Sequence, residues 1–565
     1  MFDLHAIQAE TYDVIVIGGG INGAGVARDA AARGLRTIVI EKGDFGSGTT
    51  SWSTRLIHGG LRYLEYFEFP LVRESLKERE VLLRNAPHLV KPIQLTVPVY
   101  RSGSHKGWEI EAGMVLYDIL SYDKSLPNHR RLGLKECSRL LPSLSTDGLT
   151  GAVQYYDAQV EYAERLCLEV IQAAEQSGAT VLNYCEAIEV QQQERTISAV
   201  RVRDVITGDE FSIPAGPNTI VVNTSGPWLD RVCERGTEAG ESKPLSDRRL
   251  VGGTKGSHIF VESFPGAPDT ALYVEAQDGR PYFVVPWLGG YLIGTTDFRY
   301  EGDLDRIKID DDEIDYLIDA TNKVIPTAQL TRADVQFTYS GVRPLPYREG
   351  KSAGAITRKH IILDHRNNGG TQNLISLIGG KLTTHRNSSQ EIVDMVCKRL
   401  GKSVAPCRTA TTPLPGAISF SDPIRSYTID RYRDRLPARS IEHLFMLYGN
   451  KAPAVLALAD EEFALFDPII DGLPDIKAQV VYAVSHEYAR TITDIVNRRT
   501  SLSVLSNFGY DSVGRVAGVL VRYCNWDRET CIDQVREHAV YVQDNCVPDY
   551  IAGDRRYLSQ ILQTT

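Results

Sequence analysis

The sequence predicts an α/β plus α architecture: a discontinuous Rossmann-like domain, an inserted antiparallel-sheet domain and a C-terminal helical domain. Three observations lead to this prediction. A strand–turn–helix–strand pattern opens the chain, short alternating strands fill 249–347, and helical periodicity dominates 419–565. The predicted boundaries are 12–90, 150–240 and 355–400 for the Rossmann-like domain, 91–149 and 241–354 for the inserted domain, and 412–565 for the helical domain.

Composition narrows the class of protein. The chain has 565 residues and a net charge of -10, and it carries no basic stripe, which excludes a general nucleic-acid binder. Its nine cysteines are scattered without a CxxC pair, so we predict reduced thiols and no metal site. The start of the chain lacks the features of a signal peptide, and no run approaches the roughly 18 apolar residues of a spanning helix. We therefore expect a cytoplasmic location.

The first predicted unit covers 12–41. "YDVIVIG" is a buried strand, "GGGINGAG" a turn, "VARDAAARG" a helix and "LRTIVIEK" a second strand. Gly18, Gly20 and Gly23 give G-x-G-x-x-G where the strand passes into the helix, which allows a tight turn, close approach of a pyrophosphate and close helix packing. Glu41 ends the second strand and can accept hydrogen bonds from ribose hydroxyls. This context predicts a dinucleotide site.

Further elements follow along the chain. Apolar spacing predicts a helix over Leu71–Leu83 and an amphipathic helix over Asp157–Ser177 that Gly178 stops. "ATVLNYCEAIEV" and "NTIVVNTSG" are predicted strands with a hairpin near Thr207 between them, and an antiparallel sheet follows. The strand–glycine–helix pattern returns at 373–400, before a linker at 409–417. The helical region after the linker contains no catalytic motif.

Two later glycine turns favour FAD over NAD as the dinucleotide. FAD is elongated, so it needs contacts from segments that return to the domain late in the chain. "IGGKLTTHR" offers Gly379 and Gly380 at a helix start, with backbone N–H groups, a positive dipole and the charge of Lys381 for a reduced flavin. "NTSGPW", with Gly226, is a second closure at a strand end. NAD would need neither segment.

Together these motifs resemble the FAD-dependent, quinone-reducing glycerol-3-phosphate dehydrogenases of the D-amino-acid-oxidase-like flavoproteins. The likeness covers about 12–386 and is weaker beyond 412; it is carried by "VIGGGINGAGVARDAAARGL", "TSWSTRLIHGGLRYLE", "KGSHI", "IGTTD", "TYSGVRPL", "AITR" and "GGKLTT". The chain departs from the family at Arg55, often a lysine, at "NTSGPW" in place of "NATGPW", and at His385, usually an aromatic residue. No D-x-D-x-D-G run occurs, so calcium loops are not expected.

The pattern and the resemblance together imply a set of cofactor contacts around FAD. The residues are Gly18, Gly20, Gly23, Glu41, Thr49, Ser51, Thr54, His58, Gly59, Gly60, Gly226, Gly379, Gly380, Lys381 and Thr383. Gly59 and Gly60 lie in "SWSTRLIHGGLRYLEYFEF" and provide the small residues that a flavin ring or its substrate requires.

The resemblance also implies a cationic substrate pocket. Arginine binds phosphate through two N–H groups, so guanidinium groups near the flavin suit a phosphorylated substrate. The expected substrate-binding residues are Arg62, Tyr63, His258, Arg343, Arg358 and Lys381. Arg55 is expected only to support its own loop, and His88 and His360 are interpreted as structural.

The implied reaction is oxidation of sn-glycerol 3-phosphate to dihydroxyacetone phosphate, with hydride transfer to flavin N5. His258 is the predicted base, because histidine has a suitable pKa and cationic neighbours would keep it neutral. An alternative leaves the proton to water, with Arg343 polarising the hydroxyl. These two residues are the predicted catalytic pair.

Three other readings remain open at this level. An oxidase would pass the electrons to oxygen, a redox-sensing flavoprotein would not turn over, and an amine oxidase is disfavoured by the several arginines. A membrane quinone as acceptor requires peripheral attachment, for which 106–120 or the C-terminal domain are the candidate segments. A homodimer is also open.

Overall fold

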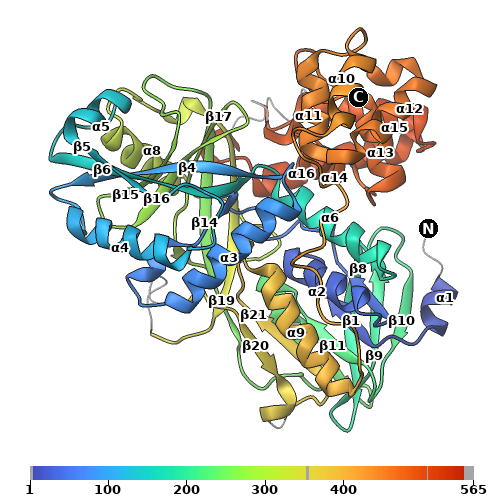
Figure 1. Cartoon of the computed structure of the whole chain (residues 1–565). Helices are drawn as coiled ribbons and strands as arrows, with labels where there is room; N and C mark the ends of the chain where they lie inside the picture. The colour runs from blue at the N-terminus through green and yellow to red at the C-terminus, as the bar shows by residue number, and fades with distance from the viewer. Residues whose placement is uncertain (1–3, 351–355, 369, 505–506, 553–565) are drawn as a thin grey trace.

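The computed structural model describes residues 4–350, 356–368, 370–504 and 507–552, and it confirms the predicted α/β plus α architecture (Figure 1). A six-stranded sheet forms the centre of the Rossmann-like part. Its strands, in spatial order, are β20 (Ile361–Asp364), β21 (Leu374–Ile378), β11 (Ile220–Asn223), β1 (Val14–Ile17), β2 (Thr37–Ile40) and β7 (Thr180–Leu182). All neighbours are parallel except the antiparallel pair β20 and β21.

This sheet is covered on both faces, which explains its continuously apolar strands. Val14 and Val16 of β1 face the helices α2 (Ile21–Ala32), α6 (Ala163–Gln176) and α9 (His385–Leu400). Ile15 and Ile17 face a second, five-stranded sheet. The strands of that sheet are β8 (Cys185–Gln193), β9 (Thr196–Asp204), β10 (Glu210–Pro214), β12 (Gly236–Glu238) and β13 (Glu241–Ser242), and α1 (Leu4–Ala9) packs against β10.

A ten-stranded, mostly antiparallel sheet forms the inserted part. Its strands are β3 (Leu56–Ile57), β4 (Val90–Tyr100), β5 (Arg130–Gly133), β6 (Leu149–Val160), β14 (Val251–Val261), β15 (Ala271–Glu275), β16 (Pro281–Trp287), β17 (Gly290–Gly294), β18 (Phe298–Arg299) and β19 (Val335–Pro346). The helices beside it are α3 (Phe69–Asn85), α4 (Gly107–Leu120), α5 (Leu134–Leu140) and α8 (Asp311–Val324), with the short helix η1 (Leu61–Leu64) before α3. The helix predicted at 71–83 is therefore confirmed as α3.

Two elements differ from the sequence prediction. The strand expected over 179–190 is broken before Cys185, where Tyr184 has φ +56°, into β7 of the six-stranded sheet and β8 of the five-stranded sheet. The helix expected over 157–177 begins only at Ala163, because 157–160 complete β6 and pair with β4. The helical spacing of apolar residues extends into 157–160 by coincidence. The backbone of these residues is extended because they belong to the long ladder between β6 and β4. The segment 150–240, predicted to belong to the cofactor domain, thus starts with a strand of the ten-stranded sheet.

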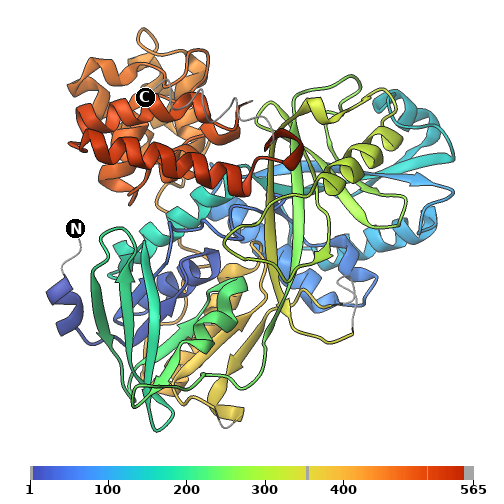
Figure 2. The ribbon, with the colours of Figure 1, turned by 180° about the vertical axis from the view of Figure 1, so that it is seen from behind.

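The C-terminal part is helical, as predicted. It contains α10 (Pro423–Tyr432), α11 (Ala438–Tyr448), α12 (Ala452–Glu461), α13 (Lys477–His486), α14 (Ile492–Asp494), the π-helical turn η8 (Ile495–Arg499), α15 (Tyr510–Tyr523), α16 (Arg528–Asn545) and α17 (Asp549–Ala552). Seen from behind, the red C-terminal helices reach the ten-stranded sheet (Figure 2). There, Thr338 Oγ1 donates a hydrogen bond of 2.6 Å to the carbonyl of Cys546.

A buried ion pair joins α3 to α9, two elements from different parts of the chain. Nε and NH2 of Arg386 each donate to one carboxylate oxygen of Glu78 at 2.7 Å, and both residues are buried. Removal of one partner would leave a buried charge uncompensated.

We expect Glu78→Ala to lower the free energy of unfolding by about 3–5 kcal/mol, because Arg386 would keep its buried charge without a partner. Urea unfolding followed by circular dichroism measures the change. Asp123→Ala is the matched control, since its two-oxygen pair with Arg73 is partly exposed and is expected to contribute less than about 1 kcal/mol. Equal losses in the two variants would contradict the assignment.

Candidate cofactor and substrate site

A cavity of about 560 Å³ lies where the glycine turn, the loop after β2, the ends of β11 and β21 and the middle of β19 meet. This volume is within the roughly 300–1,000 Å³ usual for ligand pockets. The predicted cofactor residues Gly18, Gly20, Glu41, Thr49, Gly226, Gly379 and Gly380 line the cavity. Segments more than 300 residues apart in the chain therefore form one site, as a long dinucleotide requires.

The glycines of the turn are required by backbone packing. Gly18 has φ +105°, a conformation that other residues rarely adopt. A Cβ on Gly23 would lie 1.8 Å from the carbonyl oxygen of Gly18 and 2.7 Å from Oγ1 of Thr224. A Cβ on Gly20, at the N-terminus of α2, would meet only Oγ1 of Thr50 at 3.3 Å, so the cavity side of this residue is open. The turn thus exposes a helix N-terminus to the cavity, where it attracts phosphate.

Glu41 is held in place at the end of β2. Its two carboxylate oxygens accept hydrogen bonds from the N–H groups of Gly19 at 2.7 Å and Gly43 at 2.9 Å. Burial raises the pKa of Glu41, and these two N–H groups act in the opposite direction. Each oxygen keeps a lone pair for a ribose hydroxyl.

Other predicted cofactor residues lie outside the cavity wall and support it. Ser51 donates to the carbonyl of Gly46 at 2.7 Å, and Thr383 Oγ1 accepts from the backbone N–H of His58 at 3.3 Å. Any other residue is excluded at Gly59, because its Cβ would lie 2.4 Å from the hydroxyl of Tyr117. Gly60 has φ +80° and begins η1, which turns the chain toward the predicted substrate residues.

The predicted substrate residues gather around Asp297, a residue that sequence reasoning did not select. Its carboxylate pairs with Arg343 at 3.3 Å and with Arg358 at 2.8 Å. Arg343 also donates to Oγ1 of Thr295 at 2.9 Å. Asp297 is the last residue of the motif "IGTTD". The sequence signal for it was a carboxylate directly after a predicted strand, in a chain whose later motifs carry arginines.

Arg62 and Tyr63 lie on η1 close to this cluster. Burial acts to lower the pKa of Arg62. Tyr66 and the charge of Asp297 act to raise it, and the pKa is raised overall. Burial raises the pKa of Tyr63, although the charges of Arg358 and Arg343 act against it. Arg62 is thus affected by the charge of Asp297, and Tyr63 by the charges of the two arginines that pair with Asp297.

Lys381 lies beside the same cluster, at the start of the last glycine turn. Its ammonium group is 4.7 Å from the ring centroid of Tyr63 and donates to Oγ of Ser75 at 2.9 Å. Burial lowers the pKa of Lys381 to about 8, although Asp157 and Glu74 act to raise it. The side chain therefore carries its charge below about pH 8.

His258 is buried on β14 and held on two sides. Its Nε2 lies 2.9 Å from Oγ1 of Thr54, and its ring stacks on Tyr339 with centroids 4.8 Å apart. Nδ1 has no hydrogen-bond partner among the described residues. Burial, together with the charges of Arg343 and Arg55, lowers the pKa of His258 well below its usual range. The imidazole is therefore neutral.

His58 and Arg55 have different surroundings. Burial and the charge of Lys381 lower the pKa of His58 to about 3. Arg55 pairs with Glu164 at 2.8 Å and stacks over Trp287, so it supports the loop between β2 and β3.

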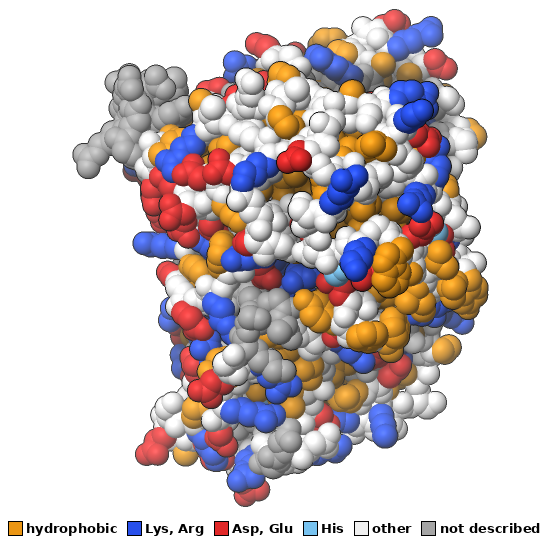
Figure 3. All heavy atoms as spheres, turned by 90° about the vertical axis from the view of Figure 1, so that its left-hand side faces the viewer, with side chains coloured by type: hydrophobic (Ala, Val, Ile, Leu, Met, Phe, Trp, Pro, Cys, Tyr) orange, Lys and Arg blue, Asp and Glu red, His pale blue; other side chains and the backbone are white. Residues whose placement is uncertain are grey.

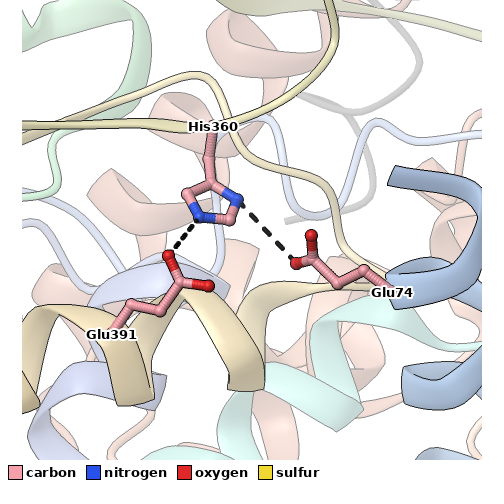
Figure 4. Close-up of side chains that lie close together, drawn as sticks. All are labelled: Glu74, His360 and Glu391. Carbon is pink, nitrogen blue, oxygen red and sulfur yellow. Dashed lines mark hydrogen bonds and ion pairs between the residues drawn. The ribbon is translucent and has the colours of Figure 1, made fainter. Parts of the chain in front are cut away.

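One group of side chains within the described residues has the composition of a metal site: Glu74, His360 and Glu391 (Figure 4). Nε2 of His360 lies 3.1 Å from Glu391 and Nδ1 lies 3.9 Å from Glu74, so the two ring nitrogens face different carboxylates. The amide of Asn387 donates to both carboxylates, at 3.2 and 2.8 Å. These contacts account for the group as a polar bridge between α3 and α9.

Comparison with known proteins identifies relatives of both parts of the chain. Residues 13–386 match the FAD dependent oxidoreductase family, and 407–531 match the C-terminal domain of alpha-glycerophosphate oxidase. A glycerol-3-phosphate dehydrogenase of Synechocystis is 55% identical, over 96% of this chain and 98% of the relative. A D-erythritol 1-phosphate dehydrogenase of Brucella abortus is 37% identical, over 87% of this chain and 95% of the relative.

A solved structure extends the likeness to the whole fold. The glycerol-3-phosphate dehydrogenase from Bacillus halodurans, complexed with FAD, superposes with a TM-score of 0.76 at 27% identity and covers 96% of both chains. The glycine cradle, Glu41 and the cavity of the present chain fit the same cofactor. FAD is therefore the cofactor of this protein. No helix among the described residues is long and apolar enough to cross a membrane.

We expect Gly23→Ala to weaken FAD binding by at least about tenfold. The added Cβ forces the glycine turn away from α2, and overpacking of this kind costs about 1–3 kcal/mol. Titration of the FAD-free protein with FAD, followed by flavin fluorescence, measures the affinity. Gly518→Ala on α15 is the control, because its Cβ meets nothing within 4 Å and is expected to leave the affinity unchanged. Unchanged affinity in Gly23→Ala would contradict this account of the turn.

Proposed function

The chain belongs to the family of FAD-dependent glycerol-3-phosphate dehydrogenases, and from this premise we propose that it oxidises sn-glycerol 3-phosphate to dihydroxyacetone phosphate. The observation that carries the proposal is the placement of Arg343 and Lys381. Each lies in the chain between two residues that line the cofactor cavity, Val342 and Pro344 in one case and Gly380 and Leu382 in the other. Their backbones therefore lie at the wall of the cavity, which supports a role for these two cations where the substrate approaches the flavin.

A phosphate dianion suits the cluster around Asp297. The carboxylate offsets one positive charge, and Arg62, Arg343 and Arg358 leave a net positive pocket. Guanidinium groups held by a carboxylate are oriented before the ligand arrives, which reduces the entropy lost on binding. A neutral polyol would gain little from such a pocket.

The proposed reaction needs a base beside the reacting hydroxyl. Bound FAD supplies the hydride acceptor. Neutral His258 takes the hydroxyl proton in this proposal, and Thr54 fixes the orientation of the ring through Nε2. Arg343 stabilises the negative charge that develops on the substrate oxygen. If water takes the proton instead, Arg343 keeps the same role.

We expect sn-glycerol 3-phosphate to bleach the flavin absorption of the purified protein under anaerobic conditions. Arg343→Lys should raise KM for the substrate at least about tenfold, because an ammonium group cannot bind phosphate through two N–H groups. Arg332→Lys, remote on the surface, is the control.

Glycerol and D-erythritol 1-phosphate, tested in parallel, separate recognition of the phosphate from recognition of the carbon chain. Preferential bleaching by D-erythritol 1-phosphate would change the assigned substrate. A flavin spectrum that responds to no phosphorylated polyol would favour a sensing role and contradict the proposed oxidation.

A quinone in the membrane is the electron acceptor in this proposal. Large apolar side chains are exposed on α3, on α4 and on the turns that follow η1 and α4, and η1, α3 and α4 contact one another. Figure 3 shows hydrophobic side chains gathered on this side of the molecule. The exposed residues are Tyr66, Phe67, Phe69, Trp108, Val115, Ile119 and Tyr122. Such an apolar face supports peripheral attachment to a membrane, where the quinone lies.

We expect the double variant Phe67→Ser with Trp108→Ser to lose sedimentation with anionic liposomes and to reduce quinone in them at least about tenfold more slowly. These side chains are 77% and 66% exposed, so their removal should leave anaerobic flavin bleaching intact. Phe463→Ser, on a 68% exposed residue of the C-terminal domain, is the matched control. Rapid oxygen consumption without quinone would instead identify an oxidase.

A further inference from the structure

The C-terminal helical domain reaches the cofactor cavity. Thr493 of α14, Arg498 of η8 and Tyr541 of α16 line it together with the glycine turn. We propose that this domain is part of the FAD site: a pair of arginines on η8 holds the loop after β2, through Asp44, in the position that binds FAD. The C-terminal domain then determines how tightly the cofactor is retained.

Asp44 is the point of contact between the loop and the C-terminal domain. Its Oδ2 accepts hydrogen bonds from Nε of Arg498 at 2.5 Å and NH1 of Arg499 at 2.7 Å, and its Oδ1 accepts from NH2 of Arg499 at 2.9 Å. The residue is 1% exposed. Burial acts to raise the pKa of Asp44, but the two guanidinium groups outweigh it and lower the pKa to about 2. The carboxylate is therefore charged and fully paired.

The loop that carries Asp44 is built into the cofactor site. Gly43, next to it, donates its N–H to Glu41, and Gly46 donates to the carbonyl of Gly19 at 3.1 Å. Thr50 Oγ1 accepts from the first N–H of α2, that of Ile21, at 3.1 Å. Each of these contacts ends on the glycine turn or on the carboxylate at the cavity. A shift of Asp44 would therefore move the groups that face the dinucleotide.

The two arginines are themselves held in fixed orientations. Arg498 pairs with Asp494 at 2.6 Å, and Arg499 donates through Nε and NH2 to the carbonyl of Glu487. Both lie on a π-helical turn, a rare local structure that occurs frequently at functional sites. The turn presents two consecutive side chains to one carboxylate.

A second buried pair crosses the same interface away from the cavity, and it provides the control. NH1 and NH2 of Arg165, on α6, donate to the two carboxylate oxygens of Glu487 at 2.7 Å each. Both residues are fully buried, and neither lines the cavity. Glu487→Gln weakens this pair but keeps the backbone carbonyl that holds Arg499, so the contacts of Asp44 are retained.

The test measures FAD affinity rather than turnover. The full-length protein is freed of FAD and titrated with FAD by flavin fluorescence. Asp44→Asn keeps the shape of the side chain but removes its charge, and we expect the Kd for FAD to rise at least about tenfold. Glu487→Gln is expected to lower the unfolding midpoint while its Kd for FAD stays within about twofold of the parent value.

Two results would overturn the inference: a Kd within about twofold of the parent in Asp44→Asn, or equal increases in Asp44→Asn and Glu487→Gln, which would mean general loosening of the interface. If Asp44→Asn does not fold, Arg499→Lys replaces it, because lysine keeps the charge and cannot bridge both oxygens. A several-fold rise in its Kd supports the inference, and an unchanged Kd refutes it. No substrate is needed, so the outcome is independent of the proposed reaction.

Discussion

The contact between the glycine turn and α2 is the constraint on which the site depends. Gly23 has no Cβ, so the carbonyl of Gly18 can lie against the helix and the N-terminus of α2 can open onto the cavity. Helix dipole and free N–H groups then favour a pyrophosphate at this point. The loops after β2, β11 and β21 converge on the same turn, because parallel strands end at one edge of the sheet.

Charge is distributed unevenly around this turn. On the side of the proposed substrate residues, one carboxylate, Asp297, pairs with two arginines and leaves an excess of positive charge. On the side of the C-terminal domain, the carboxylate of Asp44 is paired with two arginines, Arg498 and Arg499. We assign no anionic ligand to this second cluster. A buried ion pair adds little net stability, because the desolvation of its two charges offsets their attraction. In this protein the pairs place loops that face the cofactor.

The sequence predicted those site residues that lie close together in the chain, and it missed those whose partners lie far away in the chain. Gly18, Gly20, Gly23 and Glu41 follow from spacing along one strand–turn–helix unit, where neighbours in the chain are neighbours in space. Asp297 was missed, because its role depends on two arginines that lie 46 and 61 residues further along the chain. The helix start at 163 was missed as well, because pairing with β4 overrides the helical spacing of 157–160.

The sequence alone determined the fold class and the dinucleotide cofactor, because these depend on residue type and on short-range spacing. Only the tertiary structure decided which charges meet. It brought η8 of the C-terminal domain to Asp44, 454 residues away from Arg498, and so gave a role to a region without a sequence motif. Long-range contacts of this kind arise from the packing of whole elements, which no local pattern encodes.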